Sequence, residues 1–284
     1  MASTDGLRLR RLGPADIEDC LALSDGAGWN QTADDWRFML DQGLGFGLAE
    51  DGAPIVASAL VLPFGETLAW ISMVLVDPDW RRRGLATRLM EHCLEACAER
   101  GYLPFLDATA AGAEVYAKLG FEGLFGITRW QAESPAMVAP AGPPLAPLRG
   151  PLPAAVSALD LAAFGADRSA LLTMLLDRSA SRAYASDDGQ NGFVLARDGR
   201  RAWQIGPLVA HDAASAQALL TAALAGNREA PCFVDLCDGR DGLEALLKDA
   251  GFTKQRGFLR MRLGKGPAVG VPEMLFAIAG PELG

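Results

Sequence analysis

The sequence predicts a mixed α/β fold, with an α+β mixed sheet in each of two similar domains. Strand-like segments alternate with amphipathic helical segments, and the order of these elements in the first half of the chain repeats in the second half. A proline-rich stretch separates the halves. The chain of 284 residues is long enough for two domains of ordinary size, each with its own core.

The clearest boundary is the segment 134–153, SPAMVAPAGPPLAPLRGPLP, which holds seven prolines. Proline lacks a backbone N–H donor and fixes φ, so neither a helix nor a central strand is expected to run through this segment. It is predicted to be a semi-extended linker. The predicted domains are residues 1–133 and 154–284, joined by 134–153.

Periodicity and capping signals predict the elements of the first half. Thr32, followed by Asp34 and Asp35, marks a helix start, and the segment 85–100 has apolar residues at every fourth position before Gly101 ends it. Further helices are predicted at 14–25 and 111–119. The predicted strands are 7–12, 46–51, 54–62, 68–76, 104–108 and 121–131.

The second half repeats the order strand, helix, strand, helix, strand, over 202–210, 212–225, 231–237, 242–250 and 251–263. The distance from Ile71 to Phe121 is 50 residues, and that from Ile205 to Phe252 is 47. Few residues are identical between the halves. The order of elements, rather than the letters, therefore indicates a duplication.

Composition excludes several functional classes. A formal net charge of −9 disfavours a nucleic-acid-binding protein, which would need a basic face. No apolar run reaches the ~20 residues that span a bilayer. The five cysteines form no CxxC pair and there are two histidines, so we expect no metal site. The N-terminal segment lacks the apolar core of a signal peptide, and we expect a reduced, soluble, cytoplasmic protein.

An arginine cluster stands where a strand passes into a helix, in WISMVLVDPDWRRRGLATRL. The first amides of a helix have no internal partners, and the helix dipole makes that end partly positive. Gly84 lets a phosphate approach the backbone, and Arg81, Arg82 and Arg83 add charge-assisted bonds. The alternative is an ordinary helix start with solvated arginines.

The surrounding residues resemble the GNAT superfamily of acyl-CoA-dependent N-acyltransferases. The resemblance covers roughly residues 7–132 and rests on Val-Asp-Pro-x-Trp-Arg-x-x-Gly-x-Ala-Thr at 76–87 and on Tyr-Ala-Lys-Leu-Gly-Phe at 116–121. With the GWN element at 28–30 and the ending FAIAGPELG, the whole chain resembles the tandem YitH/HolE-type acetyltransferases. These likenesses imply two tandem GNAT-like domains, the second divergent and without the CoA-binding motif.

The resemblance implies acetyl-CoA as co-substrate, its pyrophosphate on the arginine turn and its pantetheine arm along the preceding strand. The implied contacts are Val74, Leu75, Val76, Arg81, Arg82, Arg83, Gly84, Leu85, Ala86 and Thr87. One position departs from the family pattern. Thr109 stands seven residues before the signature tyrosine, where the family often has an asparagine that contacts CoA.

The implied reaction is direct attack of an amine on the thioester. A tyrosine, whose ordinary pKa is about 10, keeps its proton at neutral pH and can give it to the leaving thiolate, and Tyr116 holds that position in the family signature. Asp107 and Glu66 are candidate bases that would act through water. Exposed or structurally bonded carboxylates are the commoner outcome for such residues, and a mechanism without a base stays open.

The acceptor is expected to be a primary amine of a small molecule, in a pocket shaped by the first two helices and their loop. Trp29 and Asn30 are the expected lining residues, although Trp29 covering the core edge and Asn30 capping the next helix fit equally well. Two other functions stay open: a non-catalytic acyl-CoA sensor, and an acetyltransferase for protein N-termini or lysines. The presence of Tyr116 favours an enzyme over a sensor, although a buried helix residue with a hydrogen-bonded hydroxyl is the alternative for this position.

The second half is not expected to bind acetyl-CoA. Its strand-to-helix junction, AHDAASAQALL, has neither the glycine nor the arginines, and Asp212 is read as a helix cap. Leu247 replaces the tyrosine. This half is expected either to complete the acceptor site or to hold the first half in shape. Arg168 precedes a predicted helix, and a solvated side chain is expected there, with binding of an acidic acceptor as the alternative.

Overall fold

The computed structural model describes residues 4, 6–139, 145, 147–179, 182–227 and 229–284. They form two units, Met1–Leu106 and Asp107–Gly284. The predicted linker lies within the second of these units, and its residues 140–144 and 146 are outside the described residues. Its described residues form no helix or strand, and Pro147 makes an isolated β-bridge with Tyr184. The domain boundaries at 133 and 153 stay a prediction.

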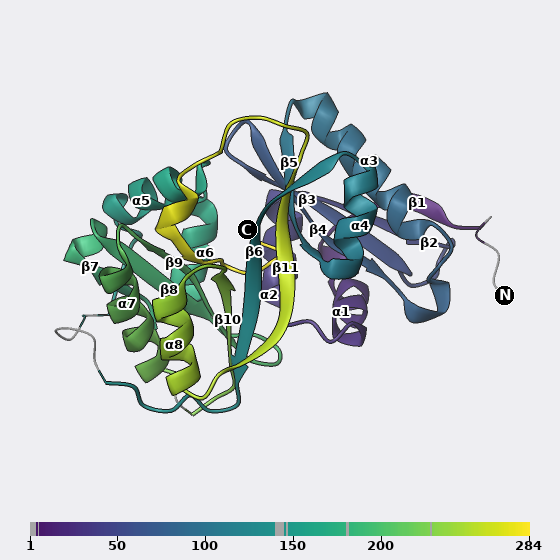
Figure 1. The fold of residues 1–284 in the computed structure, drawn as a ribbon. Helices are drawn as coiled ribbons and strands as arrows, with labels where there is room; N and C mark the ends of the chain where they lie inside the picture. Colours follow the sequence, from purple (N-terminus) through teal and green to yellow (C-terminus); the bar gives the residue numbers. More distant parts are fainter. Residues whose placement is uncertain (1–3, 5, 140–144, 146, 180–181, 228) are drawn as a thin grey trace. The chain divides into compact units, whose positions relative to one another are not determined.

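The first unit contains the helices and strands predicted for it, with ends shifted by a few residues (Figure 1). Its elements are β1 (Arg8–Leu12), α1 (Ile17–Gly26), α2 (Ala33–Gln42), β2 (Leu44–Ala49), β3 (Ala57–Phe64), β4 (Leu68–Val76), α3 (Leu85–Arg100) and the first residues of β5 (Leu103–Thr109). Strands β1 to β4 are antiparallel neighbours in chain order, and β5 pairs parallel to β4. Helix α3 packs on β3 and β4 through its apolar side.

Local chemistry explains where the helices of the first unit begin and end. The Thr32 hydroxyl accepts a bond from the Asp35 amide and the Asp35 carboxylate accepts one from the Thr32 amide, which forms a capping box at the start of α2. Helix α3 ends at Gly101, whose φ of 70° is the left-handed conformation that glycine adopts without strain. Both predicted signals are confirmed.

Strands β4 and β5 separate soon after they meet. Their pairing runs for three residue pairs, from Leu68 opposite Leu103 to Trp70 opposite Phe105. Beyond Trp70, no described strand of the first unit pairs with β4 on that side. On the other side a β-bulge at Met73, with φ of 52°, interrupts the pairing with β3 and increases the local twist.

The second unit contains the elements predicted for the second half together with some that were not predicted. Its elements are α4 (Ala110–Lys118), β6 (Phe121–Ala132), α5 (Ala154–Phe164), α6 (Ser169–Ser179), β7 (Tyr184–Ser186), β8 (Gly192–Arg197), β9 (Trp203–Ala210), α7 (Ala213–Ala225), β10 (Cys232–Cys237), α8 (Asp241–Asp249), β11 (Thr253–Leu263) and β12 (Leu275–Ala277). The strand order is β11-β6-β10-β12-β9-β8-β7. The long strands β6 and β11 run side by side, and α7 lies beside α8 (Figure 1).

Strands β9 and β10 repeat the behaviour of β4 and β5, but the gap between them is filled. They pair in parallel for three residue pairs, ending at Ile205 opposite Val234. The short strand β12 then lies between them, with Ala277 opposite both Leu236 of β10 and Leu208 of β9. The second unit therefore closes its own sheet at the place where the first unit leaves one edge of β4 unpaired.

All five cysteines are buried and unpaired. Cys93 and Cys97 face the core from α3, as their helical spacing predicts. Burial raises the pKa of Cys20, Cys232 and Cys237 to about 12. The thiols therefore stay protonated at neutral pH and pack as small apolar groups.

Buried ion pairs hold the second unit together at positions that look ordinary in the sequence. Arg129 donates from Nε and Nη2 to the two carboxylate oxygens of Asp235, both at 2.7 Å. The expectation of a solvated Arg168 is wrong: this residue is 2% exposed and donates to both carboxylate oxygens of Asp160, at 2.7 and 3.0 Å. Buried arginines require such partners because an unpaired charge inside a protein is costly.

We predict that Asp235→Asn destabilises the second unit by about 3–5 kcal/mol, since breaking one partner of a buried ion pair leaves an uncompensated charge. Urea unfolding monitored by circular dichroism measures the change. Asp249→Asn, at the exposed end of α8, is the matched control and should stay within about 0.5 kcal/mol of the wild type. Equal stability of the two variants would contradict a structural role for the pair.

Candidate functional site

The turn that follows β4 has an unusual backbone. Arg82 has a φ of 61° and Gly84 a φ of 76°, so two left-handed residues stand with only Arg83 between them. A left-handed conformation is strained for arginine, and such strain persists where the surroundings or a ligand require it. Turns of this kind direct successive amides toward one point, which is a common way to bind an anion.

The N-terminus of α3 lies open beside this turn. No side chain of the described residues caps it, and its first intrahelical bond is donated by the Arg88 amide to the Gly84 carbonyl at 3.0 Å. The amides of Leu85, Ala86 and Thr87 precede that bond and need acceptors from elsewhere. A Cβ built on Gly84 would meet no atom within 4 Å, so there is room for a phosphate next to the backbone.

The arginines of the turn shape it and leave cationic groups at its surface. Arg81 Nε donates to the Val76 carbonyl at 3.2 Å, and Arg83 Nη2 donates to the Asp79 carbonyl at 2.7 Å. The Arg83 guanidinium also stacks over Trp80, 4.9 Å from the ring centroid. Arg81 and Arg82 are exposed. The turn can therefore offer both amides and guanidinium groups to a diphosphate.

The unpaired edge of β4 leads directly to the turn. Val74 and Val76 are partly exposed, and their strand has lost β5 as a neighbour by this point. Backbone donors and acceptors on such an edge suit an extended ligand that carries amides. The structure thus brings the predicted strand residues and the predicted phosphate turn together within the first unit.

The loop between α1 and α2 holds the predicted acceptor residues. Trp29 is partly exposed, and its amide donates to the Ser24 carbonyl at 2.9 Å, while Asn30 is 2% exposed. Thr32, not Asn30, caps α2, so the capping alternative for Asn30 is wrong.

Two polar groups of the first unit were missed by the sequence analysis. Gln31 Oε1 and Ser72 Oγ are both buried, and neither has a hydrogen-bond partner among the described residues. Buried polar atoms without partners are uncommon, and a ligand or a bound water can supply the missing bond. Gln31 follows Asn30 in the sequence, and Ser72 precedes the bulge at Met73. Their positions beside these residues are the one sequence feature that could have pointed to them.

Tyr116 belongs to α4 of the second unit, and Thr109, the last residue of β5, directly precedes this helix. Tyr116 is partly exposed near the end of the helix, with its ring centroid 6.1 Å from that of Phe121. The Thr109 hydroxyl caps α4 by accepting a bond from the Gly112 amide at 3.3 Å. A capping function explains why a short hydroxyl residue suits position 109.

Asp107 is fixed by an ion pair. Arg260 donates from Nε and Nη2 to its two oxygens, both at 2.9 Å, and the carboxylate is fully buried. Burial raises the pKa of Asp107 more than the charge and hydrogen bonds of Arg260 lower it. Glu66, the other candidate base, is exposed in the turn before β4.

The junction between β9 and α7 in the second unit differs from the turn after β4. The Asp212 carboxylate accepts a bond from the Ser215 amide at 2.8 Å and one from the Ser215 hydroxyl at 3.1 Å. The carboxylate of Asp212 thus caps the N-terminus of α7, as the sequence predicts. Together with β12, this cap leaves the second unit without the two features that distinguish the first.

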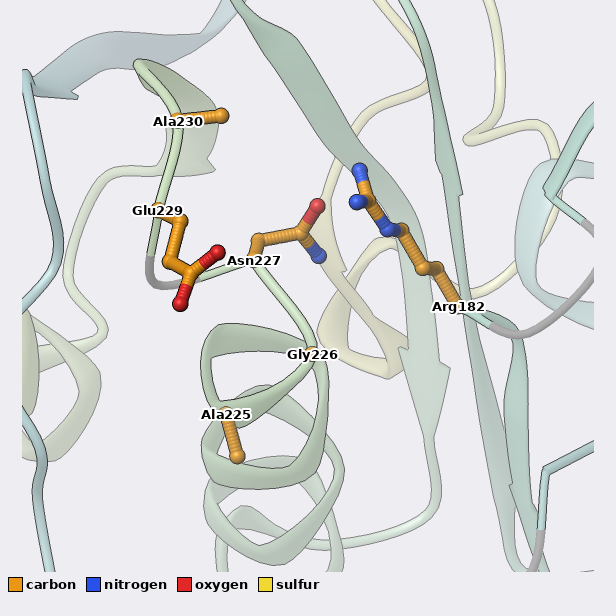
Figure 2. A pocket seen from close by; sticks show the side chains of 6 residues that line it. All are labelled: Arg182, Ala225, Gly226, Asn227, Glu229 and Ala230. Carbon is orange, nitrogen blue, oxygen red and sulfur yellow. The ribbon is translucent and has the colours of Figure 1, made fainter.

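A pocket of about 360 Å³ lies elsewhere in the second unit, at the C-terminal end of α7. Figure 2 shows the Asn227 amide extending from this end toward Arg182. A helix C-terminus is partly negative and repels a phosphate. The pocket contains no residue of the predicted site, and we do not assign the phosphate group to it.

Comparisons with known proteins agree with this geometry. Two acetyltransferase models match: the GNAT family model over residues 16–121 and a GNAT domain model over residues 156–277. The chain belongs to the GNAT acetyltransferases. It is a tandem GNAT protein and an acyltransferase. The resemblance stated from the sequence and the predicted fold class are both confirmed. The proline-rich stretch falls between the two matched ranges.

Similar proteins match this chain over most of its length. The chain is 28% identical over 250 residues to the uncharacterized N-acetyltransferase YitH of Bacillus subtilis, covering 87% of this chain and 88% of YitH. A Pyrococcus horikoshii protein assigned as an acetyltransferase has a similar fold, with a TM-score of 0.82, 23% identity, and coverage of 100% and 98%. A tandem GNAT protein from the clavulanic acid biosynthesis pathway gives a TM-score of 0.61 at 16% identity, with coverage of 92% and 98%.

Two negative findings apply to the described residues. No helix among them is long and apolar enough to cross a membrane. No group of three or more histidine, cysteine, aspartate or glutamate side chains among them could hold a metal ion.

Proposed function

We propose that the chain transfers an acetyl group from acetyl-CoA to the primary amine of a small molecule. The observation that carries the proposal is the uncapped N-terminus of α3 at the end of a strand edge without a partner. These two features fit the two polar parts of CoA, a pyrophosphate and an amide-containing arm. GNAT acetyltransferases act on an acceptor, and the small primary amine is our choice among acceptors.

The residues that would hold acetyl-CoA are those at which the two features meet. The first-turn amides of Leu85, Ala86 and Thr87, with Arg81, Arg82, Arg83 and Gly84, would bind the pyrophosphate, and the backbone of Val74, Leu75 and Val76 would bind the pantetheine arm. Acetyl-CoA supplies the acyl group in activated form, as a thioester. The protein then has to position the amine and manage two protons.

Tyr116 is the proposed general acid, which donates its hydroxyl proton to the leaving sulfur. The attacking amine must also lose a proton, and a lysine-like amine is about three to four pKa units from neutrality at pH 7, a cost of roughly 4–5 kcal/mol. Asp107 stays a prediction for the base. Its ion pair with Arg260 favours a structural role, in which case the amine proton passes to solvent.

Trp29 and Asn30 are proposed to line the acceptor pocket, and the orphaned Gln31 Oε1 offers an acceptor for the amine N–H. Residues 1–133 would carry the CoA-binding chemistry, and residues 154–284 would complete the acceptor site or support it. A panel of small amines and short peptides, assayed by release of free thiol, tests the acceptor class. Turnover of peptides alone would contradict a small-molecule acceptor.

We predict that Gly84→Glu weakens acetyl-CoA binding at least about tenfold, or 1.4 kcal/mol, in a calorimetric titration. The carboxylate would occupy the open space beside Gly84 and repel the pyrophosphate. Gly101→Glu is the matched control. Gly101 has a φ of 70°, also with no atom within 4 Å of a built Cβ, but at the other end of the same helix. Equal loss of binding in both variants would remove the turn from the proposal.

We predict that Tyr116→Phe lowers kcat by about 10²-fold or more and leaves the Kd for acetyl-CoA within about twofold, because it removes a proton donor and not a binding group. Tyr102→Phe is the control and should leave kcat unchanged. Steady-state kinetics and calorimetry on the same preparations measure both quantities. An unchanged kcat for Tyr116→Phe would exclude it as the acid.

A further inference from the structure

A row of polar side chains crosses the sheet of the second unit. The strand registers place Arg256 of β11 opposite Arg129 of β6, and Arg129 opposite Asp235 of β10. Gln204 of β9 and Arg197 of β8 stand opposite each other and continue the row. Gln204 Nε2 donates to Asp235 Oδ2 at 3.0 Å, which links the two parts.

The acids of this row are already bound to arginines. Asp235 accepts two bonds from Arg129, and Glu282 forms an ion pair with Arg197. All four side chains of these pairs are at most 5% exposed. The carboxylates of Asp235 and Glu282 are therefore both engaged by other arginines.

Arg256 is the third arginine of the row. It makes no hydrogen bond or ion pair with any residue that the structure describes, and its Nε is buried. Its described contact is the Phe258 ring, 5.3 Å from the guanidinium carbon to the centroid. Burial lowers the pKa of Arg256 and the charge of Arg129 lowers it further, while the charges of Asp235 and Glu282 raise it by less. Arginine nevertheless stays protonated at pH 7, so the row carries an uncompensated positive charge.

The position of Arg256 opposite Arg129 depends on an irregularity in β11. A β-bulge at Gln255 shifts the register between Lys254 and Arg256, and bulges redirect the side chains next to them. Lys254, just before the bulge, has an ordinary counter-charge in Glu244 at 3.0 Å. Like charges directly opposite each other on neighbouring strands are destabilising. The pairing of Arg256 with Arg129 is therefore a cost that an anion would relieve.

The chemistry of the row selects a carboxylate. A guanidinium binds the two oxygens of a carboxylate in one plane. The guanidinium groups of Arg129 and Arg256 both lie against the Phe258 ring, at 5.5 and 5.3 Å. An apolar ring next to the two cations favours an organic acid over an inorganic anion.

We propose that Arg256, with Arg129 beside it, binds the carboxylate of a small organic acid. This carboxylate belongs either to the acceptor amine, which rests on the proposed function, or to a separate acid that regulates the enzyme. Both sources share the same recognition chemistry, and the experiments below separate them.

The direct test is a saturation-transfer NMR titration of the full chain with benzoate and with its uncharged isostere benzamide. We expect benzoate to bind the wild type, Arg256→Gln to weaken it at least tenfold, and Arg256→Lys to fall between them. Lys254→Gln, which removes a cation from the same strand, should change the Kd less than twofold. Equal benzoate binding by Arg256→Gln and the wild type, or equal binding of benzamide, would overturn the proposal.

A loss of benzoate binding by Arg256→Gln is not expected to result from unfolding of the variant. Arg256→Gln removes a cation that has a like charge opposite it, so its melting temperature is expected to equal or exceed that of the wild type. Binding of benzoate is measured without acetyl transfer. Failure of the proposed acetyltransferase activity and failure of the carboxylate site are therefore separate results.

Kinetics with paired acceptors identify the source of the carboxylate. If the acceptor carries it, 4-aminobenzoate will have a lower KM than 4-aminobenzamide, and Arg256→Gln will raise the KM of the acid about tenfold and leave that of the amide unchanged. If a regulator carries it, benzoate will change kcat for an uncharged acceptor, and Arg256→Gln will abolish that change. Benzoate binding with neither effect would contradict both sources.

Discussion

Backbone hydrogen bonding at the point where two parallel strands separate is the constraint on which the rest of the structure depends. Strands β4 and β5 stay paired for three residue pairs and then diverge, and β9 and β10 do the same. Strand residues beyond such a point have donors and acceptors that need partners. In the second unit β12 supplies them, with Ala277 opposite both neighbouring strands. In the first unit no described strand pairs with this edge of β4 beyond Trp70, and we propose that a ligand binds there.

The helix that follows each diverging strand obeys the same rule. The first amides of α7 are satisfied by Asp212, an anion within the chain, whereas α3 begins at Gly84 without a capping side chain. A duplicated architecture has thus been completed internally in one unit and left incomplete in the other. This difference, rather than any single catalytic residue, is the reason we propose an acetyl-CoA site in the first unit and none in the second. The second unit, whose strand edge and helix N-terminus have partners within the chain, contains instead the row of polar side chains that ends at Arg256.

Local signals in the sequence were sufficient for most of the fold. Period and capping residues predicted the principal helices and strands, because Thr32, Gly101 and Asp212 act on their own neighbours. They could not predict β12, since three residues show no periodicity, and its pairing depends on strands elsewhere in the chain. The partner of Arg129 is 106 residues away in the chain. The row of polar side chains therefore depends on how distant strands pair, which no local sequence pattern shows. For the same reason, the sequence left Asp107 as a candidate base or a structurally bonded carboxylate, and could not show its ion pair with Arg260.

The stoichiometry of acetyl-CoA binding tests this account most directly. Isothermal titration calorimetry of acetyl-CoA into the full wild-type chain should give one equivalent per chain, with a Kd in the micromolar range, roughly −8 kcal/mol at 1 μM. Two equivalents would mean that neither β12 nor the Asp212 cap closes the second unit. No binding would mean that the open helix end and the unpaired strand edge of the first unit are not a CoA site.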